Sequence, residues 1–192
     1  MKQITEEKSQ LRNQIRAARK QLDRTFLLEQ SEALCCRLLE LPELQRAKTV
    51  FCYVSCGGEV ETHRLIDTLL AQGKQVVVPR CRAKGIMDLV PIVSLAELKP
   101  SRMGILEPDA EAACVEPCEI EFAVVPAVAC GEDGSRLGQG GGYYDRFLET
   151  ADCDFAAICL ENFVFPTLPC EPHDRFMNII VTQQRVLRFE EI

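Results

Sequence analysis

Hydrophobic positions recur at helical spacing in four parts of the chain. Near the start, Ile4, Leu11, Ile15 and Leu22 are separated by polar residues, which predicts an amphipathic helix over residues 6–21. The same reasoning predicts helices over residues 24–41, 62–73 and 144–151, and Gly73 ends the helix over 62–73.

Between these helices lie short, nearly continuous apolar runs. They cover residues 49–54, 75–79, 88–93, 121–130, 154–160 and 178–182. Strands without a polar face must be covered on both sides, and strands that alternate with helices form mainly parallel sheets. We therefore expect an α/β fold: a three-layer α/β/α sandwich with a mainly parallel or mixed central sheet of about six strands, in one domain over residues 1–192.

The stretch GSRLGQGGGYYDRFLE, residues 134–149, follows one predicted strand and opens a predicted helix. Ligands of α/β sheets bind beyond the carboxyl ends of the strands. A glycine-rich turn that opens a helix exposes free N–H groups and the positive end of the helix dipole, which suits phosphate. The stretch fits neither the P-loop nor the dinucleotide fingerprint. A phosphate cradle and a flexible surface turn both remain open from the glycines alone.

Charged residues beside the glycines favour the cradle. Arg136 and Arg146 carry planar guanidinium groups that match phosphate oxygens. Asp145 falls in the first turn of the predicted helix, where it can begin the helix or hold Mg²⁺ against bound phosphates.

Overall composition excludes several other classes. The chain has 22 Lys and Arg against 29 Asp and Glu, a formal net charge of −7, which disfavours general nucleic-acid binding. No signal peptide and no apolar run of about 18 residues are present, so we expect a cytoplasmic protein without a membrane partner. The spacing of the eleven cysteines completes no zinc set, and we interpret them as free thiols.

Residues 136–146, RLGQGGGYYDR, resemble the RLGxGxGYYDR signature of the 5-formyltetrahydrofolate cyclo-ligase family, also called 5,10-methenyltetrahydrofolate synthetases. Further matches are KSQLR (8–12), EVET (59–62), GILEP (104–108) and VP (125–126). The resemblance implies ATP- and Mg²⁺-dependent conversion of 5-formyltetrahydrofolate, with or without a polyglutamate tail, to the 5,10-methenyl form. In this reaction ATP phosphorylates the formyl oxygen, N10 attacks the activated carbon, and ADP and phosphate are released. We expect a monomer.

The same resemblance assigns site residues. The residues expected to bind ATP are Lys8, Arg12, Arg136, Leu137, Gly138, Gln139, Gly140, Gly141, Gly142, Tyr143 and Tyr144. Those expected against the folate are Cys56, Glu61 and Tyr143, with Arg136 and Tyr143 taking part in catalysis. The expected metal ligands are Asp145 and Asn178, where asparagine replaces the family's second aspartate and Asp174 or Glu171 could compensate.

Several readings of individual residues stay open. Lys8, Arg12, Arg16 and Arg19 form a stripe at helical spacing, of which the resemblance favours Lys8 and Arg12 as phosphate contacts and leaves the other two to solvent. We expect one of Tyr143 and Tyr144 to stack on a flat ring and the other to anchor the loop. Glu59 and Glu61 would face the same side of an extended segment, and either could bind the pterin.

Two other functions remain as alternatives. Cys130 and Gly131 stand where the family usually has Phe-Asp, and Asn178 stands where it has an aspartate. The chain could therefore be a folate- or nucleotide-binding paralogue that has lost turnover through Asn178 and Gly131. Another α/β phosphate-binding enzyme, such as a sugar-phosphate isomerase, would need no ATP.

Overall fold

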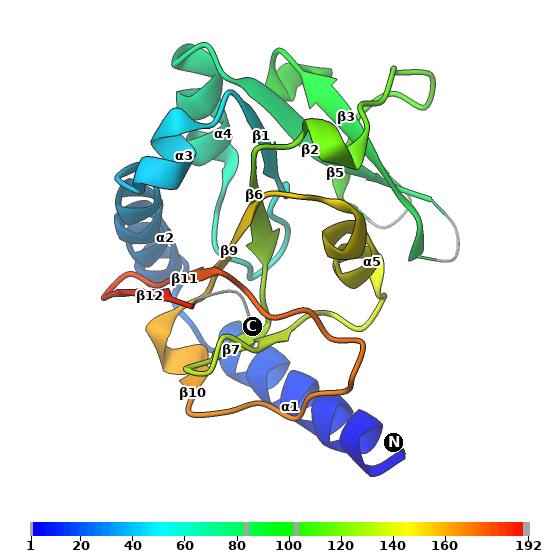
Figure 1. Ribbon diagram of the computed structural model, residues 1–192. Helices are drawn as coiled ribbons and strands as arrows, with labels where there is room; N and C mark the ends of the chain where they lie inside the picture. The colour runs from blue at the N-terminus through cyan, green and yellow to red at the C-terminus, as the bar shows by residue number, and fades with distance from the viewer. Residues whose placement is uncertain (1, 83–84, 102–103, 190–192) are drawn as a thin grey trace.

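The computed structural model describes residues 2–82, 85–101 and 104–189. A seven-stranded sheet with the order β12-β11-β9-β6-β1-β2-β3 forms its centre (Figure 1). Its strands are β1 (Thr49–Cys52), β2 (Gln75–Cys81), β3 (Met87–Ile92), β6 (Phe122–Pro126), β9 (Asp154–Ile158), β11 (Ile179–Val181) and β12 (Val186–Arg188). The five inner strands are parallel, and β3 and β12 add antiparallel edges.

The predicted α/β class and mainly parallel or mixed sheet are thus confirmed, with seven strands rather than about six. The additional strand, β12, has three residues that are at least partly exposed. Because an exposed edge strand needs no continuous apolar run, hydrophobicity alone did not reveal it.

Helices cover both sides of this sheet. They are α1 (Lys2–Lys20), α2 (Arg24–Leu39), α3 (Pro42–Arg46), α4 (His63–Ala71) and α5 (Tyr143–Thr150). Figure 1 shows α2 and α3 on one side of the sheet, α5 on the other, and α1 across its lower end. Local chemistry sets some of their ends: the Asp23 side chain caps α2, and Gly73, with φ of 78°, follows the end of α4.

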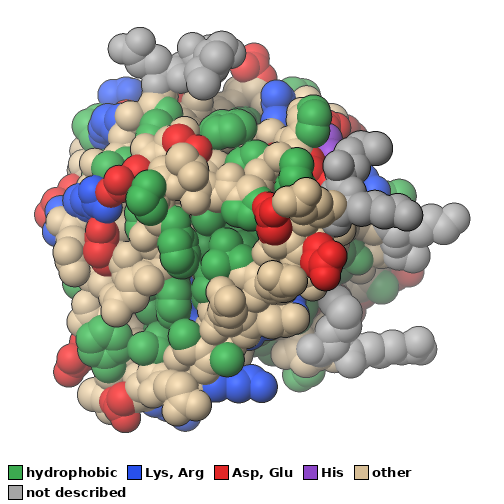
Figure 2. Space-filling view, turned by 90° about the horizontal axis from the view of Figure 1, so that it is seen from below, with side chains coloured by type: hydrophobic (Ala, Val, Ile, Leu, Met, Phe, Trp, Pro, Cys, Tyr) green, Lys and Arg blue, Asp and Glu red, His purple; other side chains and the backbone are tan. Residues whose placement is uncertain are grey.

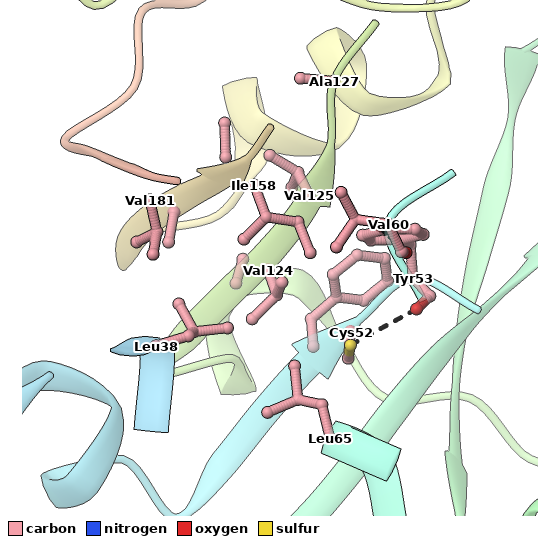
Figure 3. Close-up of a cluster of buried hydrophobic side chains, with 14 of the residues drawn as sticks. Leu38, Cys52, Tyr53, Val60, Leu65, Val124, Val125, Ala127, Ile158 and Val181 are labelled. Carbon is pink, nitrogen blue, oxygen red and sulfur yellow. Dashed lines mark hydrogen bonds between the residues drawn. The ribbon is translucent and has the colours of Figure 1, made fainter. Parts of the chain in front are cut away.

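The core lies on both faces of the inner strands. Figure 3 shows Leu38 of α2 and Leu65 of α4 among the side chains of the strands, and both are buried. Toward α5, the rings of Phe51 and Phe147 lie 4.7 Å apart. This two-sided burial is the physical reason that the strand sequences are continuously apolar.

The apolar run at 121–130 is two strands, and the prediction of a single strand there was wrong. After Pro126 the chain leaves the central sheet, and β7 (Ala129–Gly131) pairs with β8 (Arg136–Leu137) and β10 (Val164–Phe165) in a separate three-stranded sheet. The amide N of Val128 donates to the Leu137 carbonyl at 2.7 Å. Because both strands are buried, no polar residue marks the break. The glycine loop consequently follows the β7–β8 hairpin, not the central strand.

The remaining regular structure is short. A two-stranded sheet joins β4 (Lys99–Pro100) to β5 (Leu106–Glu107), and single 3₁₀ turns cover Leu95–Glu97, Pro117–Glu119 and Glu161–Phe163. Figure 2 shows hydrophobic side chains gathered in the middle of the face seen from below, with most of the visible Lys and Arg toward its edges. All eleven cysteines are free thiols. Among the described residues, no helix combines the length and apolar character that crossing a membrane requires.

Candidate functional site

The glycine loop, residues 138–142, connects β8 to α5. Gly140 and Gly142 have φ of 95° and 67°, the left-handed region that favours glycine. A Cβ added at Gly140 would also lie 3.3 Å from Cζ of Arg12. The glycines therefore serve both the bend of the loop and its close contact with α1.

Two hollows meet at this loop. The inner cavity, of about 320 Å³, is lined largely by apolar groups, including those of Tyr53, Val54, Pro79, Pro126, Ala127 and Val128, together with the loop. The outer hollow, of about 390 Å³, is lined by Thr5, Lys8, Arg12, Arg146, Glu149, Glu171, His173 and Asp174. Gly140, Gly142 and Asp145 line both, so a single backbone segment separates an apolar compartment from a charged one.

Lys8 and Arg12 reach this region from α1. The buried Nζ of Lys8 donates to Glu171 at 2.9 Å and to Asp174 at 2.5 Å. Burial lowers the pKa of Lys8, but the hydrogen bonds and charges of Asp174 and Glu171 outweigh burial and leave this pKa raised. Nε of Arg12 donates to the Gly138 carbonyl at 2.7 Å. The structure thus brings the two ends of the predicted nucleotide site together.

The other two cations of the stripe are not left to solvent alone. Arg16 is exposed, yet its Nη2 donates to Oε1 of Gln139 at 2.9 Å. Arg19 is half-buried and donates to the carbonyls of Ala127 at 2.7 Å and Val128 at 3.0 Å. The prediction that Arg19 faces solvent was wrong, because α1 packs across the segment that follows β6.

Arg136 and Asp145 form an ion pair beneath the loop. Nη2 of Arg136 donates to Oδ1 of Asp145 at 2.7 Å, and its Nη1 donates to the Pro126 carbonyl at 3.2 Å. Only 1% of the Arg136 side chain is exposed, against 27% of that of Asp145. The guanidinium also lies 5.8 Å from the centre of the Tyr144 ring. Arg136 therefore holds the carboxylate that both hollows share.

The two tyrosines that follow the loop take different positions. The ring of Tyr144 packs edge-on against Phe51, with 6.3 Å between ring centres, and burial raises its pKa. Tyr143 lines the inner cavity, and its hydroxyl donates to the Arg82 carbonyl at 3.1 Å. Both tyrosines therefore line the inner cavity, and Tyr144 also anchors the loop in the core.

The structure places Glu59, but not Glu61, among the residues that line the inner cavity. Glu59 lines the inner cavity with Cys56 and accepts a hydrogen bond from the Cys56 amide N at 3.1 Å. Glu61 lies in a neighbouring groove, which Glu59 and Cys56 also line, and accepts a hydrogen bond from the His63 amide N at 2.6 Å. Its carboxylate is used at the start of α4, and for this reason it does not face the cavity.

The Cys56 thiol is expected to be unreactive. Burial, with the nearby Glu59 charge, raises the pKa of Cys56 to about 11. A thiol with this pKa is protonated near neutral pH and is a weak nucleophile. At the inner cavity Cys56 consequently offers packing, not covalent chemistry.

Asn178 is not brought to Asp145. Its Oδ1 accepts from the Phe155 amide N at 2.9 Å, where β9 and β11 begin, whereas the glycine loop lies where β6 ends. The described residues that line the two hollows do not include Asn178. Glu171 and Asp174, the substitutes suggested for it, do share the outer hollow with Asp145.

Sequence reasoning gave no role to other residues of the inner cavity. Ile105 and Glu107 belong to the GILEP match and line the cavity, as does Cys81, whose amide N donates to Glu107 at 3.2 Å. That match was the available signal for these positions. Pro126 belongs to the VP match, whereas Ala127 and Val128 carried no signal, because apolar residues at the end of a buried strand resemble core residues in sequence.

The fold and the site define a mixed α/β protein in which a glycine loop divides a largely apolar cavity from a hollow lined by charged side chains. The sequence of the 5-formyltetrahydrofolate cyclo-ligase family matches residues 4–183, and the chain belongs to this family. Membership supports ligase activity on a folate.

Individual relatives agree over nearly the whole chain. A probable 5-formyltetrahydrofolate cyclo-ligase of Schizosaccharomyces pombe is 31% identical over 198 residues, covering 94% of this chain and 97% of the relative. The Escherichia coli K12 5-formyltetrahydrofolate cyclo-ligase is 30% identical over 181 residues, with 90% and 98% covered. The solved structure of Aquifex aeolicus 5,10-methenyltetrahydrofolate synthetase superposes with a TM-score of 0.86 at 32% identity and covers 96% and 93% of the two chains.

Proposed function

We propose that this protein converts 5-formyltetrahydrofolate to 5,10-methenyltetrahydrofolate, using ATP and Mg²⁺ and releasing ADP and phosphate. The observation that carries the proposal is that one glycine loop lines both an apolar cavity and a charged hollow. Such an arrangement lets the pterin end of a folate meet a phosphoryl donor across the loop. Family membership supports the same activity.

The inner cavity suits the pterin end of a folate. Its walls include Pro79, Pro126 and Val128, and Tyr143 offers a ring at its edge. Ligand cavities of this kind are mostly apolar with a few polar groups that set orientation. Glu59 provides such a group, because a carboxylate accepts from the N–H donors of a pterin edge.

The outer hollow suits triphosphate together with a divalent cation. Its described lining holds three cationic side chains, Lys8, Arg12 and Arg146, against the four carboxylates Asp145, Glu149, Glu171 and Asp174. This excess of negative charge would repel ATP alone. Asp145 would hold Mg²⁺, which neutralises the charge of the phosphates. Lys8 gives two of its three donors to carboxylates and keeps one for a phosphate oxygen.

The proposed reaction requires no covalent bond between the protein and the substrate. The γ-phosphoryl group moves from ATP to the formyl oxygen, its bond to ADP breaking as the new P–O bond forms. N10 then attacks the formyl carbon, the C–O bond breaks with release of phosphate, and the N10 proton leaves. Phosphoryl transfer depends on positioning and charge neutralisation. The loop, Lys8 and Arg12 would position the donor, and Arg136 would hold the Asp145 carboxylate.

A direct test follows methenyl product by its absorbance with 5-formyltetrahydrofolate, leaving out ATP or Mg²⁺ in turn. We expect product only when both are present, with one ADP released per product. Binding of folate and nucleotide without ADP release would instead identify a non-catalytic paralogue. Product formed without ATP would contradict the proposal.

Removing the charges of Lys8 and Arg12 is expected to weaken the binding of ATP and not that of folate. In the double variant Lys8→Met/Arg12→Met, the aliphatic stems remain while the charged donors are lost. Hydrogen bonds to charged groups contribute about 1.5–3 kcal/mol each, so loss of two of them should raise the KM for ATP roughly 100-fold or more. Steady-state kinetics at varied ATP and at varied folate concentration measure the two KM values separately. Lys20→Met, at an exposed position of the same helix, is the control; an unchanged KM for ATP in the folded double variant would make α1 a structural helix only.

Gly140→Ala tests the close contact between the loop and α1. The new methyl group would occupy left-handed backbone and meet Arg12 at 3.3 Å. Left-handed backbone costs a non-glycine residue about 1–2 kcal/mol, so a comparable loss of ATP binding would raise its KM about 10-fold. Gly73→Ala is the matched control, since Gly73 has φ of 78° and open space around it. It should lose stability without a change in KM, and an equal KM effect in both variants would rule out a local role for Gly140.

A further inference from the structure

Arg19 makes interior contacts from the last turn of α1. Its Nη2 donates to the carbonyls of Ala127 at 2.7 Å and Val128 at 3.0 Å. The guanidinium also lies over the buried ring of Phe163, 5.3 Å from its centre. A cation with two carbonyl acceptors and an aromatic face is firmly located.

The segment that Arg19 holds is a wall of the inner cavity. Pro126, Ala127 and Val128 all line this cavity. The chain leaves the central sheet here, so these carbonyls lose the acceptor role they would have in a strand ladder, and buried carbonyls need other donors. Arg136 donates to the Pro126 carbonyl at 3.2 Å and Arg19 to the next two. Two guanidinium groups thus hold three successive carbonyls.

We propose that Arg19 is a positioning residue of the folate cavity, an inference that rests on the function proposed above. By binding the carbonyls of Ala127 and Val128, it sets the orientation of these two peptide groups. The wall then presents apolar surface to the bound folate, because its acceptor oxygens are already engaged. Loss of Arg19 would let these peptides reorient and would weaken folate binding.

The position of Arg19 on α1 separates this role from nucleotide binding. Lys8 and Arg12 lie at the outer hollow, and Arg19 lies eleven residues beyond Lys8, about 16 Å along the helix axis. A defect at Arg19 should therefore raise the KM for folate and leave the KM for ATP unchanged. A general loss of α1 packing would affect both.

The experiment compares Arg19→Gln and Arg19→Lys with Lys20→Gln, an exposed neighbour. Because hydrogen bonds to a charged donor are lost, Arg19→Gln should raise the KM for 5-formyltetrahydrofolate about 5- to 20-fold and keep the KM for ATP within about twofold. Arg19→Lys should lie between parent and Arg19→Gln, since an ammonium still donates to a carbonyl. Calorimetric titration with 5-formyltetrahydrofolate in the absence of ATP should show the same order of affinities.

Distinct outcomes overturn the inference. Unchanged folate KM and affinity in folded Arg19→Gln would do so, as would equal increases in both KM values. If Arg19→Gln does not fold, Phe163→Leu removes the ring beneath the guanidinium and keeps its hydrogen bonds; its folate affinity should fall about 2- to 3-fold, and an unchanged value contradicts the proposal. If the parent binds folate without forming product, the proposed function is contradicted, but titration of folate affinity still tests the role of Arg19. If the parent binds no folate, both the proposed function and the role of Arg19 are contradicted.

Discussion

Replacement of Asp145 by asparagine is expected to lower kcat about 100- to 1,000-fold, the usual loss when one group that stabilises transferring charge is removed. Asp145 lines both hollows, and its carboxylate is the proposed Mg²⁺ ligand beside the phosphates. Asparagine keeps the size of the side chain and can still accept from Arg136. The expected loss therefore reflects charge and not shape. Initial rates at graded Mg²⁺ should also show a higher Mg²⁺ requirement.

The control for this variant is Asp67→Asn, the same change at an exposed position of α4. Its rate and Mg²⁺ requirement should equal those of the parent. A folded Asp145→Asn protein with the parent's Mg²⁺ dependence would show that the metal is held elsewhere, with Glu171 and Asp174 the first residues to examine.

Arg136→Lys is expected to lower kcat about 100-fold, with a smaller change in the KM for ATP. The guanidinium donates from two nitrogens, to Asp145 at 2.7 Å and to the Pro126 carbonyl at 3.2 Å. A lysine ammonium is a single point on a flexible stem and cannot reproduce this fork. Asp145 would shift, and a misplacement of about 1 Å can cost 100-fold in rate. Single-turnover measurements at saturating ATP separate the chemical step from binding.

Arg64→Lys provides the comparison, since Arg64 pairs with Glu32 on the surface and 77% of its side chain is exposed. Surface pairs contribute little, so this variant should behave as the parent. A parent-like kcat in Arg136→Lys would mean that the ion pair with Asp145 supports folding only.

The ion pair also makes the two substitutions dependent on each other. If Arg136 acts mainly by holding Asp145, then the double variant Asp145→Asn/Arg136→Lys should be less impaired than the product of the two single losses. Residues in contact commonly show such coupling. Strictly multiplicative losses would indicate that each residue acts on its own.

The pattern of apolar residues was sufficient for most of the fold. Runs such as 49–54 and 154–160 predicted inner strands, and periodic segments predicted α1, α2, α4 and α5, because a strand buried on both faces leaves no polar alternation in its sequence. The glycine stretch likewise indicated a turn that opens a helix, and Gly140 and Gly142 form this turn with left-handed backbone. These features depend on residues that are near one another in the chain.

Only the tertiary structure decided which side chains share a hollow. Glu59 reaches the cavity and Glu61 does not, because the second carboxylate is used at the start of α4. Arg19 looked like a solvated cation until α1 was placed across the end of β6, more than one hundred residues away in sequence. Asp145 in α5 and Asn178, just before β11, lie at different ends of the sheet, and no local sequence pattern could show this. Local sequence determines periodicity and backbone freedom. The partner of a charged side chain is instead set by packing between distant segments, and the periodicity of a sequence carries no information about such packing.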